Sequence, residues 1–182
     1  TTRFGDVMAD SKIKRNVLVG LALIAGFFFG TVGEIAYEST VFQPFGWKEY
    51  APPIILNCYG DDFSEQQLLR GIDYWAKRGF PIAFYEMNPP AQTCKEESLL
   101  GFIILRKAFR GQIDDQNLAE TTRKTTGMRI LSAEIVFQPG SQNLDLIIEH
   151  ELGHAFGLGH IEKEGHIMHP LYNRMGSGFW VP

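Results

Sequence analysis

The chain has 182 residues, of which 45% are hydrophobic, so it is long enough for one domain with a buried core. Its 17 lysines and arginines are outnumbered by 21 aspartates and glutamates, which gives a formal net charge of −4. This balance argues against nucleic acid as a partner, because nucleic-acid-binding domains usually carry a basic patch or stripe.

The N-terminal part consists of a polar segment, residues 1–15, and an uncharged apolar run over residues 17–33. A helix that spans a membrane needs about 20 mostly apolar residues, and residues 16–37 satisfy that length. We therefore predict a transmembrane or anchoring helix over residues 16–37. Basic residues precede the run and would stay in the cytoplasm, so the rest of the chain is expected on the non-cytoplasmic side, held by a single span.

Two other interpretations of residues 17–33 remain open. A cleaved signal peptide would leave a secreted domain, although the run is long for such a peptide and no small-x-small cleavage site follows it. Alternatively, the apolar helix would be buried among the subunits of a larger assembly, such as a virus particle.

Residues 38–53 are rich in proline and glycine and are predicted to link this segment to a folded domain over residues 54–182. The domain is expected to begin with a buried strand from Ile54 to Tyr59. A helix follows in the prediction, with Asp61, Asp62 or Ser64 as its N-cap. Its apolar side chains form one stripe at spacings near three and four: Leu68, Leu69, Ile72 and Trp75.

Three further strands are predicted, over residues 82–87, 99–105 and 129–137. The last of them alternates with period two, which indicates a strand that is buried on one face. Polar residues 107–127 are interpreted as a long loop, and long loops in compact domains are often functional. With the helix that carries the motif described below, the predicted order is β-α-β-β-β-α.

Cys58 and Cys94 are the two cysteines of the chain, and both follow the apolar run. In an exported domain they could form a disulfide. The alternative is a pair of unbonded, partly buried thiols. Their spacing suits no zinc knuckle, and neither lies in a cysteine-protease signature.

Residues 150–160 read His-Glu-Leu-Gly-His-Ala-Phe-Gly-Leu-Gly-His. Side chains four residues apart share a helix face, so His150 and His154 can bind one metal ion. Gly157 allows the helix to end, because glycine accepts a positive φ cheaply, and His160 can then return as the third ligand. Three protein ligands leave one position open for water, which is the catalytic arrangement of zinc.

Glu151 lies one step around the helix from His150, at the edge of the surface that faces the metal. It is predicted to act as general base on the metal-bound water and not to be a ligand. The motif therefore predicts a zinc-dependent hydrolase with Zn²⁺ as its cofactor. A purely structural zinc site remains an alternative, although structural sites usually have four protein ligands.

The motif and the segment after it resemble the metzincin clan of zinc peptidases, and within that clan the matrixins. Met168 lies eight residues after His160, in a segment that resembles the Met-x-Pro-x-Tyr segment of matrixins. The resemblance implies a small α+β domain with a twisted, mostly parallel sheet and two long helices. It also implies that Met168 forms the turn beneath the metal site. The neighbouring His166 and His169 are interpreted as exposed and not as ligands.

The same resemblance implies where substrate binds. Ala133, Glu134 and Ile135 look like part of the edge strand above the cleft, to which an extended peptide would add through backbone hydrogen bonds. Pro170 and Tyr172 would line the pocket for the residue after the scissile bond.

Motif and resemblance together predict a zinc metalloendopeptidase that hydrolyses a protein or peptide substrate. A rival hypothesis is a non-enzymatic zinc-binding scaffold in a membrane or virus-particle assembly, which would use the same fold for assembly. The intact Glu151 favours the enzyme, because a scaffold does not need a general base.

Overall fold

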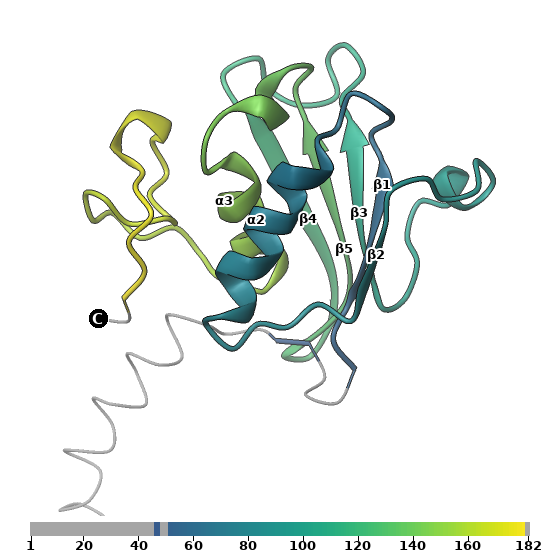
Figure 1. Ribbon diagram of the computed structural model, residues 1–182, viewed down its shortest axis with the longest axis horizontal. Helices are drawn as coiled ribbons and strands as arrows, with labels where there is room; N and C mark the ends of the chain where they lie inside the picture. The colour runs from purple at the N-terminus through teal and green to yellow at the C-terminus, as the bar shows by residue number, and fades with distance from the viewer. Residues whose placement is uncertain (1–45, 48–50, 181–182) are drawn as a thin grey trace, which may run out of the picture. The chain divides into compact units, whose positions relative to one another are not determined.

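The computed structural model describes residues 46–47 and 51–180, and Figure 1 shows the arrangement of their elements. The predicted segments 1–15 and 16–37, and most of the predicted linker, lie outside these residues. Among the residues that are described, no helix has the length and apolar character needed to cross a membrane.

A five-stranded sheet in the order β2-β1-β3-β5-β4 forms the centre of the domain. Its strands are β1 (Ile54–Cys58), β2 (Phe84–Glu86), β3 (Phe102–Lys107), β4 (Ala119–Thr126) and β5 (Arg129–Phe137). Neighbouring strands are parallel except at β4, which pairs antiparallel with β5 at one edge. Together with two α-helices, α2 (Glu65–Ala76) and α3 (Ile147–Ala155), the sheet makes the small, mostly parallel α+β domain that we predicted.

Both α-helices lie on the same face of the sheet (Figure 1). Ser64 is the N-cap of α2, and its hydroxyl accepts a hydrogen bond from the Gln67 N–H at 3.4 Å. Leu68 and Trp75 of the predicted stripe are fully buried in the core, as expected. Leu69 is 42% exposed, so its assignment to the buried stripe is wrong.

The second helix, α3, is shorter than the long helix we predicted. It has nine residues, and the segment before it forms a separate 3-10 turn over Ser141–Asn143. Leu146 has a left-handed φ of 65°, which separates the turn from the helix.

β4 occupies residues that we predicted as part of a long loop. Four of its eight residues are threonine, a β-branched residue that fits a half-buried strand. The strand pairs with β5 along its whole length and contacts α3. These contacts outweigh the polar composition that favoured a loop, and the domain has one strand more than predicted.

The prediction that Ala133, Glu134 and Ile135 belong to the edge strand is wrong. They lie in β5, between β3 and β4, and Ala133 is aligned with Ile103 on one side and with Arg123 on the other. The backbone groups of β5 are used in these two ladders, so a peptide cannot add there. The edge of the sheet on this side is β4.

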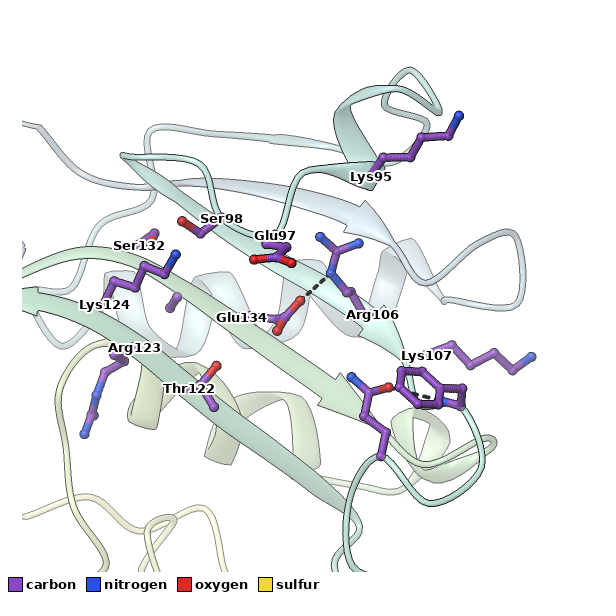
Figure 2. A pocket seen from close by; sticks show the side chains of 13 residues that line it. Lys95, Glu97, Ser98, Arg106, Lys107, Thr122, Arg123, Lys124, Ser132 and Glu134 are labelled. Atoms are coloured by element: carbon purple, nitrogen blue, oxygen red, sulfur yellow. Dashed lines mark hydrogen bonds and ion pairs between the residues drawn. The ribbon is translucent and has the colours of Figure 1, made fainter.

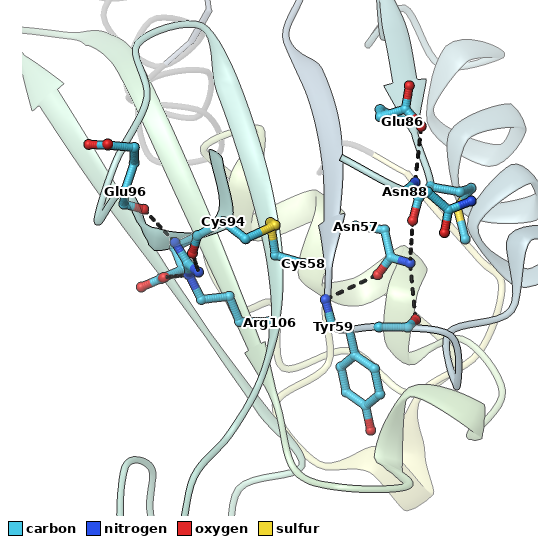
Figure 3. The surroundings of a disulfide bond; sticks show 11 residues. Asn57, Cys58, Tyr59, Glu86, Asn88, Cys94, Glu96 and Arg106 are labelled. Carbon is cyan, nitrogen blue, oxygen red and sulfur yellow. Dashed lines mark hydrogen bonds and ion pairs between the residues drawn. A yellow bond between two sulfur atoms is a disulfide. The ribbon is translucent and has the colours of Figure 1, made fainter. Parts of the chain in front are cut away.

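The connection between β2 and β3 covers part of the sheet face opposite the helices. A disulfide joins Cys58, at the end of β1, to Cys94 in this connection, with the two Cα atoms 5.5 Å apart (Figure 3). Arg106 of β3 donates hydrogen bonds to the carbonyl groups of Cys94 and Glu96 and forms an ion pair with Glu134. The disulfide and the guanidinium group together hold the connection against the sheet.

Candidate metal centre

The structure brings together the three histidines predicted as metal ligands. His150 and His154 lie one turn apart on α3, and His160 follows the end of the helix. The Nε2 atom of His154 lies 3.0 Å from that of His150 and 3.1 Å from that of His160. One ligand atom from each ring therefore lies within 4.8 Å of the other two.

Backbone carbonyl groups determine which nitrogen of the His150 and His154 rings is available to a metal. His150 Nδ1 lies 2.7 Å from the Ile167 carbonyl oxygen, and His154 Nδ1 lies 2.9 Å from the Leu158 carbonyl oxygen. A carbonyl oxygen only accepts, so each Nδ1 carries the proton and each Nε2 of a neutral ring presents a lone pair. Two lone pairs at 3.0 Å repel each other unless a cation lies between them.

This set of donors fits zinc. A tetrahedral zinc ion with Zn–N bonds of about 2.0–2.1 Å separates its ligand nitrogens by roughly 3.3 Å. Burial lowers the pKa of His150 to about 4 and the pKa of His154 to about 3. Burial also lowers the pKa of His160, with a smaller effect from the nearby His169. The rings are therefore neutral at pH 7, which is the protonation state that binds a metal ion.

Glu151 follows His150 in α3, and only 4% of its surface is exposed. Burial raises the pKa of its carboxyl group to about 7, and a hydrogen bond from Thr121 partly opposes this rise. The Thr121 hydroxyl, on β4, donates this bond to Glu151 Oε2 at 2.5 Å. A carboxyl group that titrates near neutrality can take up a proton and release it again, as a general base and acid must.

The chain turns back after α3 as the motif predicted. Gly157 has a φ of 101°, a conformation that side chains with a Cβ rarely adopt. Its N–H donates to the His154 carbonyl group and the Leu158 N–H donates to the Gly153 carbonyl group, so the helix ends with these groups satisfied. His160 is reached three residues after this turn.

Met168 is fully buried and packs against α3 at Gly153. A Cβ added at Gly153 would collide with the Met168 sulfur and would lie 2.7 Å from Trp75 Cζ2. Glycine at position 153 therefore lets the methionine and the indole approach the helix between the two ligands His150 and His154. The Ile167 carbonyl that orients His150 comes from the residue before Met168, so one segment both supports and orients the site.

The sequence model of the matrixin family matches residues 73–179, a range that contains the three histidines, Glu151 and Met168. The chain belongs to the matrixin family. A search of curated proteins found no match. Matrixins are zinc metallopeptidases, so the resemblance inferred from the sequence is confirmed at the level of the family.

Several side chains of this matrixin lie where the sequence did not predict them. His166 and His169 are buried, so the expectation that they are exposed is wrong. Their Nδ1 atoms accept hydrogen bonds from the backbone N–H groups of Met168 and Leu171, which fixes both rings in the turn.

Pro170 and Tyr172 lie on an exposed stretch after this turn. Tyr172 is the first residue of a short 3-10 helix, Tyr172–Arg174, and is 39% exposed. Their predicted role in a substrate pocket stays a prediction.

Two contacts of the site were missed from the sequence. Thr121 holds Glu151, and Trp47 donates from its indole nitrogen to the Ala155 carbonyl oxygen at the end of α3, at 3.0 Å. The four threonines over 119–126, a β-branched residue type typical of strands, were the available signal for Thr121. Nothing near Trp47 in the sequence indicates a partner 108 residues away.

A large hollow of the matrixin domain lies away from the histidines. It has a volume of about 660 Å³ and lies on the opposite face of the sheet, beside β4 and the connection between β2 and β3 (Figure 2). Three of its seven charged lining residues are in ion pairs: Arg106 with Glu134, and Lys107 with Asp62 at 3.2 Å. Among the described residues, the three histidines form the one group that could hold a metal ion, and the hollow contains no such group.

Proposed function

We propose that this matrixin domain is a zinc-dependent endopeptidase. The observation that carries the proposal is the convergence of three neutral imidazoles, two of them oriented by backbone carbonyl groups, beside a buried carboxyl group. A scaffold would need the histidines but not an acid–base group held by a dedicated hydrogen bond. No contact among the described residues favours the scaffold hypothesis.

In this proposal His150, His154 and His160 hold the zinc ion through their Nε2 atoms. Zinc bound there acts as a Lewis acid, which polarises a carbonyl group and lowers the pKa of water. Glu151 accepts the proton of the attacking water at its carboxylate and passes it to the amine that leaves. Thr121 keeps one carboxylate oxygen in place, so the other oxygen is the one that exchanges the proton.

The substrate is proposed to be a protein or peptide bound in extended form along β4. This strand is the free edge of the sheet on the side of α3, and its inward side chains already contact the site. Thr121 reaches Glu151, and Arg123 donates a hydrogen bond to the His154 carbonyl group. A peptide paired with the outer edge of β4 would thus lie beside the histidines.

We also propose that the domain is anchored to a membrane through residues 16–37, with the metal centre on the non-cytoplasmic side. The apolar run and its basic flank support this proposal. A secreted domain, or a subunit of a virus particle, is the alternative location.

Replacing Glu151 with Gln tests the enzymatic proposal. The variant keeps the size of the side chain but cannot accept a proton, so we expect peptide cleavage to fall by at least about 10³-fold while zinc stays bound. Cleavage of a peptide library and zinc content by mass spectrometry are the two measurements. Glu164→Gln, an exposed carboxylate, is the matched control and should cleave at the wild-type rate. Equal rates for Glu151→Gln and the wild type would contradict the assignment.

A further inference from the structure

Three strongly exposed apolar side chains lie at one end of the sheet. Phe84, Leu100 and Met128 are 58%, 72% and 75% exposed, and we call them the basal rim. Phe84 begins β2 and is aligned with Ile54, the first residue of β1. Leu100 precedes β3 by two residues, and Met128 lies in the turn between β4 and β5. All three positions are at the end where the parallel strands start.

The basal rim extends across the whole width of the sheet. It includes the β2 edge, the entry to β3 and the turn next to β4, and neighbouring strands lie about 4.8 Å apart. Its ends are thus separated by three to four strand spacings, or roughly 14–19 Å. Single exposed apolar side chains are ordinary on a soluble protein, but a row of them along one end of a sheet suits contact with an apolar phase.

The chain enters the domain at this same end. The Gly46 N–H donates to the Met128 carbonyl group at 3.1 Å, and the Gly46 carbonyl accepts from the Ile130 N–H at 2.9 Å. Only the eight residues 38–45 separate Gly46 from the predicted span, residues 16–37. Nine residue steps reach at most about 30 Å when fully extended. Gly46 and the adjacent Met128 therefore cannot lie far from a bilayer that holds that span.

We infer that the basal rim is a membrane-contact surface, which touches the lipid bilayer that residues 16–37 are proposed to enter. This inference depends on the proposed anchor. The apolar side chains of the rim would enter the boundary between headgroups and acyl chains. Arg129, exposed next to Met128, would place its guanidinium group among the lipid phosphates.

The inferred contact sets the height of the active site above the lipid. From Thr126, at the basal end of β4, to Thr121, which contacts Glu151, the strand rises five residues, or roughly 17 Å. A substrate anchored in the same membrane would therefore be cut no closer than about five extended residues from the bilayer surface. The matrixin would therefore select cleavage sites in the juxtamembrane stalk of membrane proteins by their distance from the bilayer surface as well as by their sequence.

Photocrosslinking of the full chain in phosphatidylcholine vesicles tests the inference. p-Benzoylphenylalanine is placed at Leu100 or at Met128, and lipid adducts are measured by mass spectrometry after irradiation. Phe109 is the matched control, because it is 71% exposed but follows β3, at the opposite end of the sheet. The same probe at Leu23, within the proposed span, reports on the anchor itself.

We expect lipid adducts at Leu23, Leu100 and Met128, at several times the yield found at Phe109. Adducts at Leu23, with yields at Leu100 and Met128 no higher than at Phe109, would overturn the membrane-contact surface and leave the anchor intact. Crosslinks from the rim to residues 38–45 instead of lipid would overturn it as well, because the chain itself would then cover the rim. No adduct at Leu23 would reject the anchor and the inference together, without bearing on peptidase activity.

Discussion

The two faces of the sheet hold their structure by different means. The face that carries α2 and α3 is closed by tight apolar packing around Trp75 and Met168, and the metal centre is built into that packing. The opposite face carries a shallow hollow, and its covering connection is held by the Cys58–Cys94 disulfide and the Arg106 guanidinium group. We therefore expect changes on the helix face to alter zinc binding and catalysis, and changes on the opposite face to alter stability alone.

Removing the disulfide should give the largest loss of stability. Cys58 and Cys94 are 36 residues apart, and a closed loop of that size constrains the unfolded chain by about 4 kcal/mol. The double substitution Cys58→Ser and Cys94→Ser should lower the free energy of unfolding by up to that amount, as measured by urea denaturation. Zinc affinity and cleavage rate at low temperature should stay close to wild type. A large drop in zinc affinity of the folded variant would show that the two faces are coupled.

Gly153→Ala should be nearly as damaging, but at the metal centre. The new Cβ meets Met168 and Trp75, which cannot both withdraw from a packed core, and overpacking of this kind costs about 1–3 kcal/mol or more. We expect lower thermal stability together with weaker zinc binding, measured by calorimetry and by competition with a chelator. Gly159→Ala is the control, because no atom lies within 4 Å of a Cβ added there. Unchanged zinc affinity in Gly153→Ala would show that the packing beneath the ligands is more adaptable than the structure indicates.

Acid should destabilise the metal-free protein because of two buried histidines on the helix face, His150 and His154. The folded state holds the pKa of His150 at about 4 and that of His154 at about 3, whereas an unfolded histidine has a pKa of about 6.5. Above pH 6.5 neither state is protonated, so this contribution to stability is fully present. As the pH falls from about 6.5 towards 4, the unfolded state takes up two protons that the folded state excludes, and stability is lost. Urea midpoints in the presence of a chelator should fall over this range, and a variant with asparagine at both positions should show a smaller slope.

Thr121→Val should have the smallest effect on folding and a selective effect on catalysis. The substitution keeps the β-branched shape in β4 but removes the hydrogen bond to Glu151, which contributes about 1.5–3 kcal/mol when the acceptor is charged. We expect kcat to fall roughly tenfold with little change in KM, and Thr121→Ser to restore most of the activity. Equal kcat values for Thr121→Val and the wild type would show that Thr121 does not position Glu151 for catalysis. Thr122→Val, at the next position of β4 and lining the hollow on the opposite face, is the matched control.

The sequence predicted the metal ligands and the strand over 129–137 because both depend on short-range rules. Helical spacing brings His150 to His154, a glycine with positive φ brings back His160, and period-two alternation marks the strand. The contact of Thr121 with Glu151 and the bond from Trp47 to Ala155 join residues 30 and 108 positions apart. Contacts between residues so far apart in sequence depend on the order of the strands in the sheet. The spacing of residues within one helix or strand does not determine that order.

The misassigned edge strand has the same origin. Ala119–Thr126 was interpreted as part of a loop because of its polar composition, so the resemblance to matrixins assigned the edge position to Arg129–Phe137. An apolar strand is better accommodated between two others, where both of its faces are covered, and the polar strand can face solvent along its free edge.

Gly46 and Trp47 give the entry of the chain two attachments, one to the turn between β4 and β5 and one to the end of α3. A mechanical pull from the N-terminal side would therefore be divided between the sheet and the helix that carries His150 and His154. A force on the residues before Gly46 would act on the Ala155 carbonyl group, the last of that helix, before the force reached β1. The geometry of the metal centre would then depend on whether the chain ahead of it is slack or stretched.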